Sequence, residues 1–333
     1  MPRYSLSMSV QADDPRTPVT LLTGWLGAGK TTLLNRLLSE PGGRRFAVLV
    51  NEFGEIGVDD RLVVRADEDL VELNNGCVCC TVRGDLVRTL TRLRRRRPPF
   101  FKRREFDHVL VETTGIAEPA PLLRTFLVEA DVAVSYRVQA IVGVADAQSL
   151  DKALCEPSAV EQLTLADLLL LNKTDLCSPE QADQVEDRLH ELNPAAPVIR
   201  CAKGNAPVDE ILRARPPRGL EDLQDRPHSH EHGSGIRAIS MRSEAPLDGM
   251  KVQLWLDSCA AIFEGKLIRF KGFLDLAGET RRAILQGVYE LYTVSYGDEW
   301  QEDEPRVTEL VFIGRDLDEE MLWRGLRACA ADV

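Results

Sequence analysis

Apolar and polar residues alternate along the first part of the chain in blocks that predict a parallel sheet. Short continuous apolar runs, typical of strands buried on both faces, occupy residues 19–22, 46–50, 108–111, 140–144 and 168–171. Helical patterns separate them, for example at residues 32–38 and 85–93. Strands that alternate with helices predict an α/β fold with a mainly parallel sheet.

The pattern changes near residue 215. A stretch rich in Pro, Gly and His predicts a linker, and a run of strands flanked by helices predicts a smaller α+β domain beyond it. In that domain Leu247, Met250, Leu254 and Ala261 mark one face of a helix. Its other predicted elements are strands at residues 236–241, 267–276, 287–295 and 307–313 and a helix at residues 319–328. The predicted plan is a tail (1–17), an α/β domain (18–215), a linker (216–235) and a C-terminal domain (236–333).

Composition narrows the functional class. The 333 residues carry 41 basic and 53 acidic side chains, a net charge of −12, which argues against general nucleic-acid binding. No apolar run approaches the roughly 20 residues of a membrane helix, and residues 1–18 lack the apolar stretch of a signal peptide. We therefore expect a cytoplasmic protein without a membrane partner. In that compartment its eight cysteines point to metal or redox chemistry before disulfides.

A phosphate-binding loop is the most specific signal. Residues 24–31 read Gly-Trp-Leu-Gly-Ala-Gly-Lys-Thr, fit G-x-x-x-x-G-K-[ST], and lie between a predicted strand and a predicted helix. Backbone N–H groups and the helix N-terminus would bind phosphate oxygens. Lys30 would reach the β- and γ-phosphates, and the Thr31 hydroxyl would bind Mg²⁺. The expected nucleotide contacts here are Gly24, Gly27, Ala28, Gly29, Lys30, Thr31 and Thr32.

A second segment indicates which base is bound. Asn172, Lys173 and Asp175 belong to an Asn-Lys-Thr-Asp sequence that directly follows a predicted strand. A carboxylate there can accept hydrogen bonds from both N1–H and the exocyclic amine of guanine, whereas adenine offers no such pair of donors. We therefore expect these three residues to bind the base of GTP.

A third segment ends the strand predicted at residues 108–111. Glu112 lies where Mg²⁺ or its water shell would be, and Gly115 can offer its backbone N–H to the γ-phosphate. With Lys30 and Thr31 these two residues form the expected catalytic set.

Cys77, Cys79 and Cys80 place three thiols within four residues. A disulfide between such close neighbours is strained, whereas three thiolates around Zn²⁺ or a similar soft ion leave a fourth position open, which suits metal transfer. Burial as small apolar side chains and redox sensing remain alternatives. The remaining cysteines are expected to be packing residues: Cys155, Cys177, Cys201, Cys259 and Cys329.

Two weaker signals flank these motifs. His228, His230 and His232 could collect a divalent metal loosely, or simply make the linker hydrophilic. The basic stretch at residues 92–104 is expected to be a solvated helix end and loop, with nucleic-acid binding or docking of an acidic partner as alternatives. His108 and His190 are expected to be structural.

As a set, these motifs resemble the CobW-type P-loop GTPases, which include zinc-transferring metallochaperones, nitrile hydratase activators and cobalamin-pathway CobW proteins. The resemblance rests on residues 24–32, 51–57, 72–81, 112–119 and 172–175, and on residues 271–273 and 310–315 in the C-terminal region. It implies a P-loop NTPase domain, a CobW-type C-terminal domain and slow GTP hydrolysis coupled to metal delivery. It also implies that Cys77, Cys79 and Cys80 are the metal ligands and that the segment around Glu52 is a nucleotide-sensitive switch. Glu52 or Glu55 would orient water or supply the fourth ligand.

The sequence therefore favours a GTP-dependent metallochaperone that binds GTP, Mg²⁺ and a transition metal, with zinc preferred, and delivers the metal to a client protein. The alternatives are a regulatory or assembly GTPase with a structural zinc site, a cobalt or iron insertion factor for a cobalamin-pathway or nitrile hydratase client, and a nucleic-acid-linked GTPase. The identity of the client and the formation of a homo-oligomer stay open.

Overall fold

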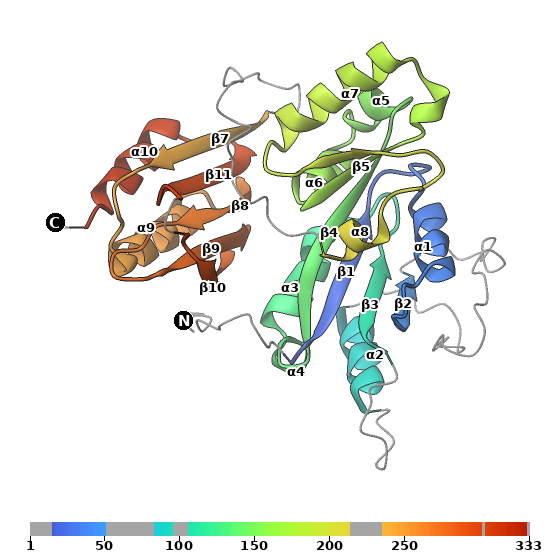
Figure 1. Cartoon of the computed structure of the whole chain (residues 1–333), viewed down its shortest axis with the longest axis horizontal. Helices are drawn as coiled ribbons and strands as arrows, with labels where there is room; N and C mark the ends of the chain where they lie inside the picture. Colours follow the sequence, from blue (N-terminus) through green and yellow to red (C-terminus); the bar gives the residue numbers. More distant parts are fainter. Residues whose placement is uncertain (1–14, 51–82, 96–105, 214–234, 302–303, 332–333) are drawn as a thin grey trace. The chain divides into compact units, whose positions relative to one another are not determined.

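The computed structural model describes residues 15–50, 83–95, 106–213, 235–301 and 304–331. The chain divides into two compact units, of which the first consists of residues 15–190 and 196–215 and the second contains residues 216–333. Each unit has its own sheet (Figure 1). Within the described residues, no helix combines the length and the apolar character needed to cross a membrane.

The first unit is built on a parallel sheet of six strands. The strands are β1 (Thr17–Thr23), β2 (Phe46–Val50), β3 (His108–Glu112), β4 (Tyr136–Asp146), β5 (Leu168–Asn172) and β6 (Val198–Arg200). Their order in the sheet is β2-β3-β1-β4-β5-β6. Each neighbouring pair is parallel, so all carboxyl ends lie at one edge. Between β3 and β4 the chain crosses from one side of β1 to the other, a switch point of the kind at which open parallel sheets bind ligands.

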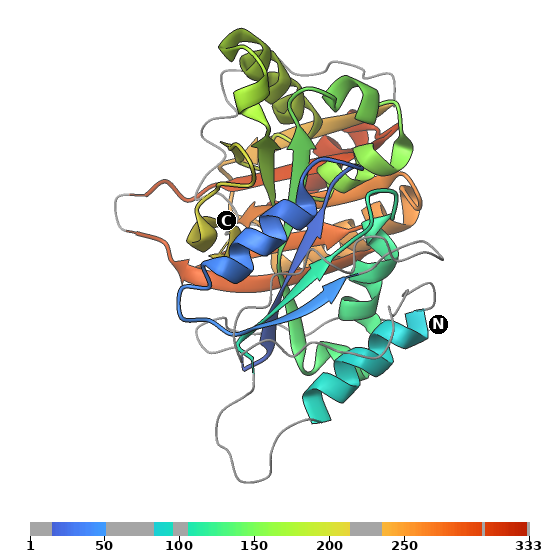
Figure 2. The ribbon, with the colours of Figure 1, turned by 90° about the vertical axis from the view of Figure 1, so that its right-hand side faces the viewer.

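Helices cover the sheet on both faces, as predicted. Apolar residues of α1 (Lys30–Ser39) and α8 (Val208–Arg213) pack with Leu22, Leu110 and Val142 on one face, and Figure 2 shows α1 in front of the sheet. The remaining helices are α2 (Arg83–Arg95), α3 (Pro119–Val128), α4 (Ala130–Ala133), α5 (Leu150–Ala153), α6 (Pro157–Thr164) and α7 (Pro179–Leu192), with a 3₁₀ turn η2 (Thr174–Leu176). Of these helices the sequence pattern locates only α1 and α2. The elements α3, α6, α7, α4, α5, α8 and β6 lie outside the predicted ones, and α4, α5, α8 and β6 are too short to show a clear period.

The second unit is the predicted small α+β domain. Its antiparallel sheet has the order β10-β9-β8-β11-β7, and two helices pack on one face. The elements are β7 (Ile236–Ser243), α9 (Gly249–Ile262), β8 (Leu267–Leu274), β9 (Arg281–Val288), β10 (Leu291–Glu299), β11 (Thr308–Arg315) and α10 (Glu319–Ala328). Asp248 and Asp318 cap the two helices by accepting backbone N–H bonds.

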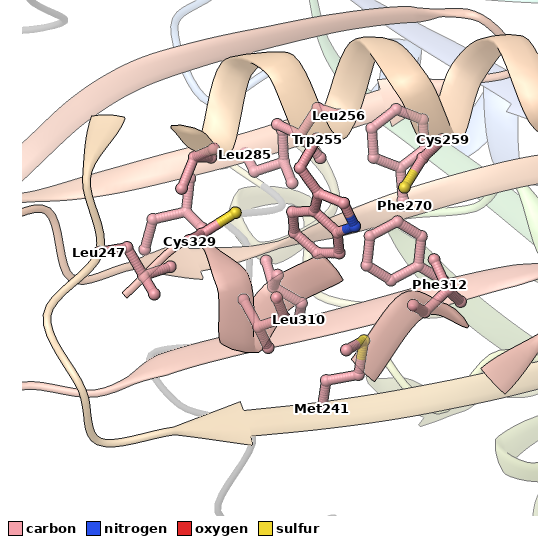
Figure 3. Packing of buried hydrophobic residues seen from close by; sticks show 14 of the residues in the cluster. Met241, Leu247, Trp255, Leu256, Cys259, Phe270, Leu285, Leu310, Phe312 and Cys329 are labelled. Carbon is pink, nitrogen blue, oxygen red and sulfur yellow. The ribbon is translucent and has the colours of Figure 1, made fainter. Parts of the chain in front are cut away.

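Aromatic rings pack among aliphatic side chains in the core of this domain (Figure 3). The rings of Phe270 and Phe312 are stacked with centroids 5.6 Å apart, and Trp255 lies 5.6 Å from Phe312 in a tilted arrangement. Two glycines leave room for these rings, because a Cβ at Gly287 would lie 2.2 Å from the Phe270 ring and one at Gly325 would lie 2.2 Å from the Trp255 indole. The two glycines on β9 and α10 thus make room for the rings on β8 and α9.

The helix predicted around Met250 is present, but its predicted face is wrong. Met250 is 75% exposed and Leu254 is 63% exposed, while Leu247 lies before the helix. The core is contacted instead by Val252, Trp255, Leu256 and Cys259. Because α9 is apolar on both sides, its sequence periodicity does not indicate which side is buried.

The strand predicted at residues 287–295 is also wrong, because these residues form parts of two strands. β9 ends at Val288, β10 begins at Leu291, and the two pair as a hairpin. Tyr289 in the turn between them has φ of 54°, a left-handed conformation that is uncommon for a residue with a side chain. The turn residues, Tyr289 and Glu290, include neither Gly nor Asn, so the sequence gives no usual turn signal there.

The prediction that the five scattered cysteines are packing residues is confirmed in part. Cys201, Cys259 and Cys329 are buried, as expected of packing residues. Cys177 is half-buried and Cys155 is exposed, so the prediction is wrong for Cys155.

His108 is buried inside the parallel sheet. One ring nitrogen is hydrogen-bonded to the Thr20 hydroxyl at 2.8 Å, and the ring meets Phe46 edge-on at 5.9 Å. Burial, together with the nearby positive charges of Arg44 and Arg137, lowers the pKa of His108 to about 4. The folded protein therefore keeps this imidazole neutral.

This pKa shift predicts a loss of stability in acid. Unfolding lets His108 regain its ordinary pKa of 6.5, so the unfolded chain binds an extra proton as pH falls from 6.5 towards about 4. The His108→Gln variant should lose about 2 kcal/mol less unfolding free energy than the wild type between pH 7 and pH 5. Urea unfolding at both pH values measures this, with His190→Gln as the control. An identical pH dependence in His108→Gln and the wild type would contradict it.

Candidate functional site

The loop between β1 and α1 has a shape that depends on glycine. Gly24 has φ of 138°, and a Cβ there would lie 2.2 Å from the carbonyl oxygen of Val144. Gly29 has φ of 106° at the N-cap of α1, and a Cβ there would lie 2.3 Å from the side-chain nitrogen of Asn172. The loop is therefore held close to the edge of the sheet and leads into a helix N-terminus, the geometry of an anion site.

Lys30 holds a positive charge at this loop. Its side-chain nitrogen donates hydrogen bonds to the carbonyl oxygens of Gly24 at 2.8 Å and Trp25 at 3.2 Å. Burial lowers the pKa of Lys30, and the negative charge of Glu112 opposes that effect. The two carbonyl oxygens thus hold the ammonium group at the glycine-rich loop, and the Glu112 carboxylate favours its charged form.

Thr31 and Glu112 are brought together as the sequence predicts. The Thr31 hydroxyl donates a hydrogen bond of 2.7 Å to Oε1 of Glu112, a buried carboxylate at the end of β3. A hydroxyl beside a carboxylate is a hard-oxygen donor pair of the kind Mg²⁺ accepts, so these residues fit the ion. Thr31 and Glu112 would hold Mg²⁺ directly or through water, and the ion would neutralise phosphate charge.

Asn172 joins the phosphate loop to a second loop. Its amide nitrogen donates to the carbonyl oxygen of Ala28 at 2.9 Å, and its amide oxygen accepts from the backbone N–H of Gly204 at 3.0 Å. The side chain is buried at the end of β5. Asn172 therefore fixes two loops that are far apart in sequence against each other.

Lys173 and Asp175 extend the site towards solvent. Lys173 has φ of 64°, and its ammonium pairs with the Asp146 carboxylate at 2.7 Å. Asp146 ends β4 and also accepts the backbone N–H of Gln148 at 2.9 Å. Asp175 lies exposed in η2, so its carboxylate is open to an incoming base.

Two parts of the site, the loop after β6 and Asp146, are not among the residues predicted from sequence. The loop that follows β6 is bonded to Thr174, whose hydroxyl donates to the Cys201 carbonyl at 3.0 Å, and Lys203 in it has φ of 51°. Non-glycine residues in left-handed conformations cluster at functional sites. The short apolar pair Val198-Ile199 before this polar loop was the available signal, since it marks a strand ending at the same sheet edge. No sequence motif singles out Asp146 as part of the site.

Gly115 lies beside the phosphate loop. A Cβ at Gly115 would lie 2.6 Å from the backbone nitrogen of Leu26. The structure thus brings Gly115 to the same edge of the sheet as Lys30, Thr31 and Glu112.

Other candidate residues lie outside the described part of the chain: Glu52, Glu55, Cys77, Cys79, Cys80, His228, His230 and His232, with the basic residues 96–104. Within the described residues, no group of three or more His, Cys, Asp or Glu side chains is arranged to hold a metal ion.

Family comparison agrees with this architecture. Residues 18–200 match the family described as "CobW/HypB/UreG, nucleotide-binding domain". Residues 236–330 match the "Cobalamin synthesis protein cobW C-terminal domain". The two matches together cover both units of the fold.

Individual relatives match over nearly the whole chain. Zinc chaperone YjiA of Escherichia coli (strain K12) is 33% identical over 317 residues, covering 93% of this chain and 98% of that protein. Zinc chaperone CobW of Sinorhizobium sp is 31% identical over 354 residues, covering 93% and 96%. The crystal structure of Zn(II)-bound YjiA GTPase from E. coli is similar with a TM-score of 0.69 at 29% identity, covering 95% and 99%. The chain therefore belongs to the CobW family, with a CobW/HypB/UreG nucleotide-binding domain and a CobW C-terminal domain.

Proposed function

We propose that this protein is a GTPase that binds zinc as cargo and delivers it to a client metalloprotein. The observation that carries the proposal of GTP binding is the Thr31–Glu112 hydrogen bond of 2.7 Å beside Lys30. Asn172 bonds the same loop to the end of β5, where the residues proposed to bind the base begin. The names of its relatives, zinc chaperones and a Zn(II)-bound GTPase, support zinc as the metal.

The groups at the loop suit phosphate-anhydride hydrolysis. Lys30 and the N-terminus of α1 would stabilise negative charge on the phosphates, and Mg²⁺ at Thr31 and Glu112 would add to that stabilisation. The backbone N–H of Gly115 would contact the γ-phosphate. Since the sequence offers no evident arginine finger or water-orienting Gln, we expect slow turnover that a partner accelerates.

The covalent path of the chain connects nucleotide and cargo. Val50, the last residue of β2, is aligned with Glu112 in the sheet, and the segment that carries Cys77, Cys79 and Cys80 follows it. Cys80 precedes α2, which begins at Arg83. A change at Glu112 when GTP is hydrolysed can therefore reach the thiols through the adjoining chain. Such coupling is typically about 1–3 kcal/mol and is reciprocal between the two ligands.

The domain plan fits a division of roles. In this proposal residues 18–215 bind nucleotide and metal, residues 216–235 connect, and residues 236–333 select the client. The described cysteines all carry free thiols, which agrees with a reducing compartment such as the cytoplasm.

The base preference predicts an altered specificity for Asp175→Asn. An amide at this position replaces one acceptor with a donor, so the pair of bonds to guanine is lost while xanthine, with oxygen at C2, becomes acceptable. We expect GDP affinity to fall by about 100-fold or more and XDP affinity to rise. Fluorescent analogues of both nucleotides measure it, with exposed Asp131→Asn on α4 as the control. Unchanged GDP affinity in Asp175→Asn would exclude this role.

The metal assignment predicts the behaviour of the triple variant Cys77→Ser, Cys79→Ser, Cys80→Ser. It should lose high-affinity Zn²⁺ binding, measured by competition with a chromophoric chelator under reducing conditions, and keep GDP affinity within about twofold. Because thiolates bind as protons leave, wild-type zinc affinity should also fall in acid. Cys155→Ser removes an exposed thiol and serves as the control. Undiminished zinc binding by the triple variant would place the metal elsewhere.

A further inference from the structure

The loop after β3 makes a tight turn at the nucleotide edge of the sheet. In this Gly115 turn (residues 114–117) the backbone N–H of Ala117 donates to the Thr114 carbonyl at 3.1 Å. On one side Gly115 packs against the backbone of Leu26 in the phosphate loop. Glu118, the N-cap of α3, follows the turn, and Pro119 begins the helix.

Gln162 holds this turn from the other side. It projects from α6, is 0% exposed, and its amide nitrogen donates to the Gly115 carbonyl at 3.2 Å and the Ala117 carbonyl at 2.9 Å. Both N–H bonds of one side-chain amide are therefore used on two carbonyls of the same turn.

The surroundings show that this amide is set in a rigid, mostly apolar element. Burying an amide costs free energy unless hydrogen bonds replace those to water, and the other residues that α6 buries include Ala159, Val160 and Leu163. The segment after α6 packs tightly on β4, where a Cβ at Gly143 would lie 3.0 Å from that of Ala166. Gln162 thus connects the glycine-containing turn to α6, a helix packed in the core.

We infer that Gln162 is a positioning residue for GTP, which holds the Gly115 turn so that the backbone N–H of Gly115 faces the γ-phosphate. This inference rests on the proposed function. Glycine has wide backbone freedom, so a turn centred on it keeps one conformation only when neighbouring groups hold it. GDP has no γ-phosphate, so the effect of Gln162 is confined to GTP binding and hydrolysis.

The test is the Gln162→Leu variant, which keeps nearly the same volume and removes both donors. We expect its affinity for a non-hydrolysable GTP analogue to fall about tenfold and kcat for GTP to fall by a similar factor. Its affinity for GDP should stay within about twofold. A purely structural role would instead lower thermal stability and change both nucleotide affinities together.

Gln139→Leu is the matched control, because Gln139 on β4 donates the same kind of bond, at 2.8 Å, to the Leu212 carbonyl of α8. It should change neither nucleotide affinity. If Gln162→Leu does not fold, Gln162→Asn is measured instead, because its shorter amide cannot reach both carbonyls. The same fall in GTP-analogue affinity relative to GDP affinity is expected. An unchanged ratio of GTP-analogue to GDP affinity would overturn the role of Gln162 alone. A wild-type protein that binds neither nucleotide would contradict the proposed function itself.

Discussion

The geometry of the nucleotide site depends on one buried side chain, Asn172. Its amide links the Ala28 carbonyl in the phosphate loop to the N–H of Gly204 beyond β6. The close approach excludes a side chain at Gly29, since a Cβ there would collide with the amide. A single amide at the end of β5 therefore fixes the distance between the glycine-rich loop after β1 and the loop after β6. These loops lie close enough for one side chain to join them because the carboxyl ends of all parallel strands lie at one edge of the sheet.

Local sequence patterns predict much of this arrangement. The strand at residues 46–50 and the helix at residues 319–328 are predicted with their observed bounds, because continuous apolar runs and strong amphipathic periods are local signals. The glycine-rich loop, Glu112 and Asn172 are likewise recognisable from spacing after strands. The Thr31–Glu112 contact follows from the topology once the strands are parallel neighbours.

Other features depend on contacts that no local pattern records. Asp146 matters because Lys173 reaches it from the next strand, and Gln162 matters because the Gly115 turn lies against α6. The hairpin at Tyr289 lacks the usual Gly or Asn, so apolar content hides it. The prediction of the buried face of α9 is wrong because the exposed Met250 and Leu254 are as apolar as the residues that the helix buries. Long-range packing therefore decides the contacts of Asp146 and Gln162 and the buried face of α9, whereas the Tyr289 turn is local and lacks a turn signal.

The two units differ in what they contribute. The first places charged and polar groups at a sheet edge, whereas the second has an apolar core that includes the stacked rings of Phe270 and Phe312. The proposal that links nucleotide to metal is tested most directly by zinc affinity of the wild-type protein, measured by chelator competition at neutral pH under reducing conditions. One sample holds GDP and the other a non-hydrolysable GTP analogue, both with Mg²⁺. Coupling between the sites predicts zinc affinities that differ by about fivefold or more. Equal affinities in the two nucleotide states would contradict a GTP-switched zinc carrier.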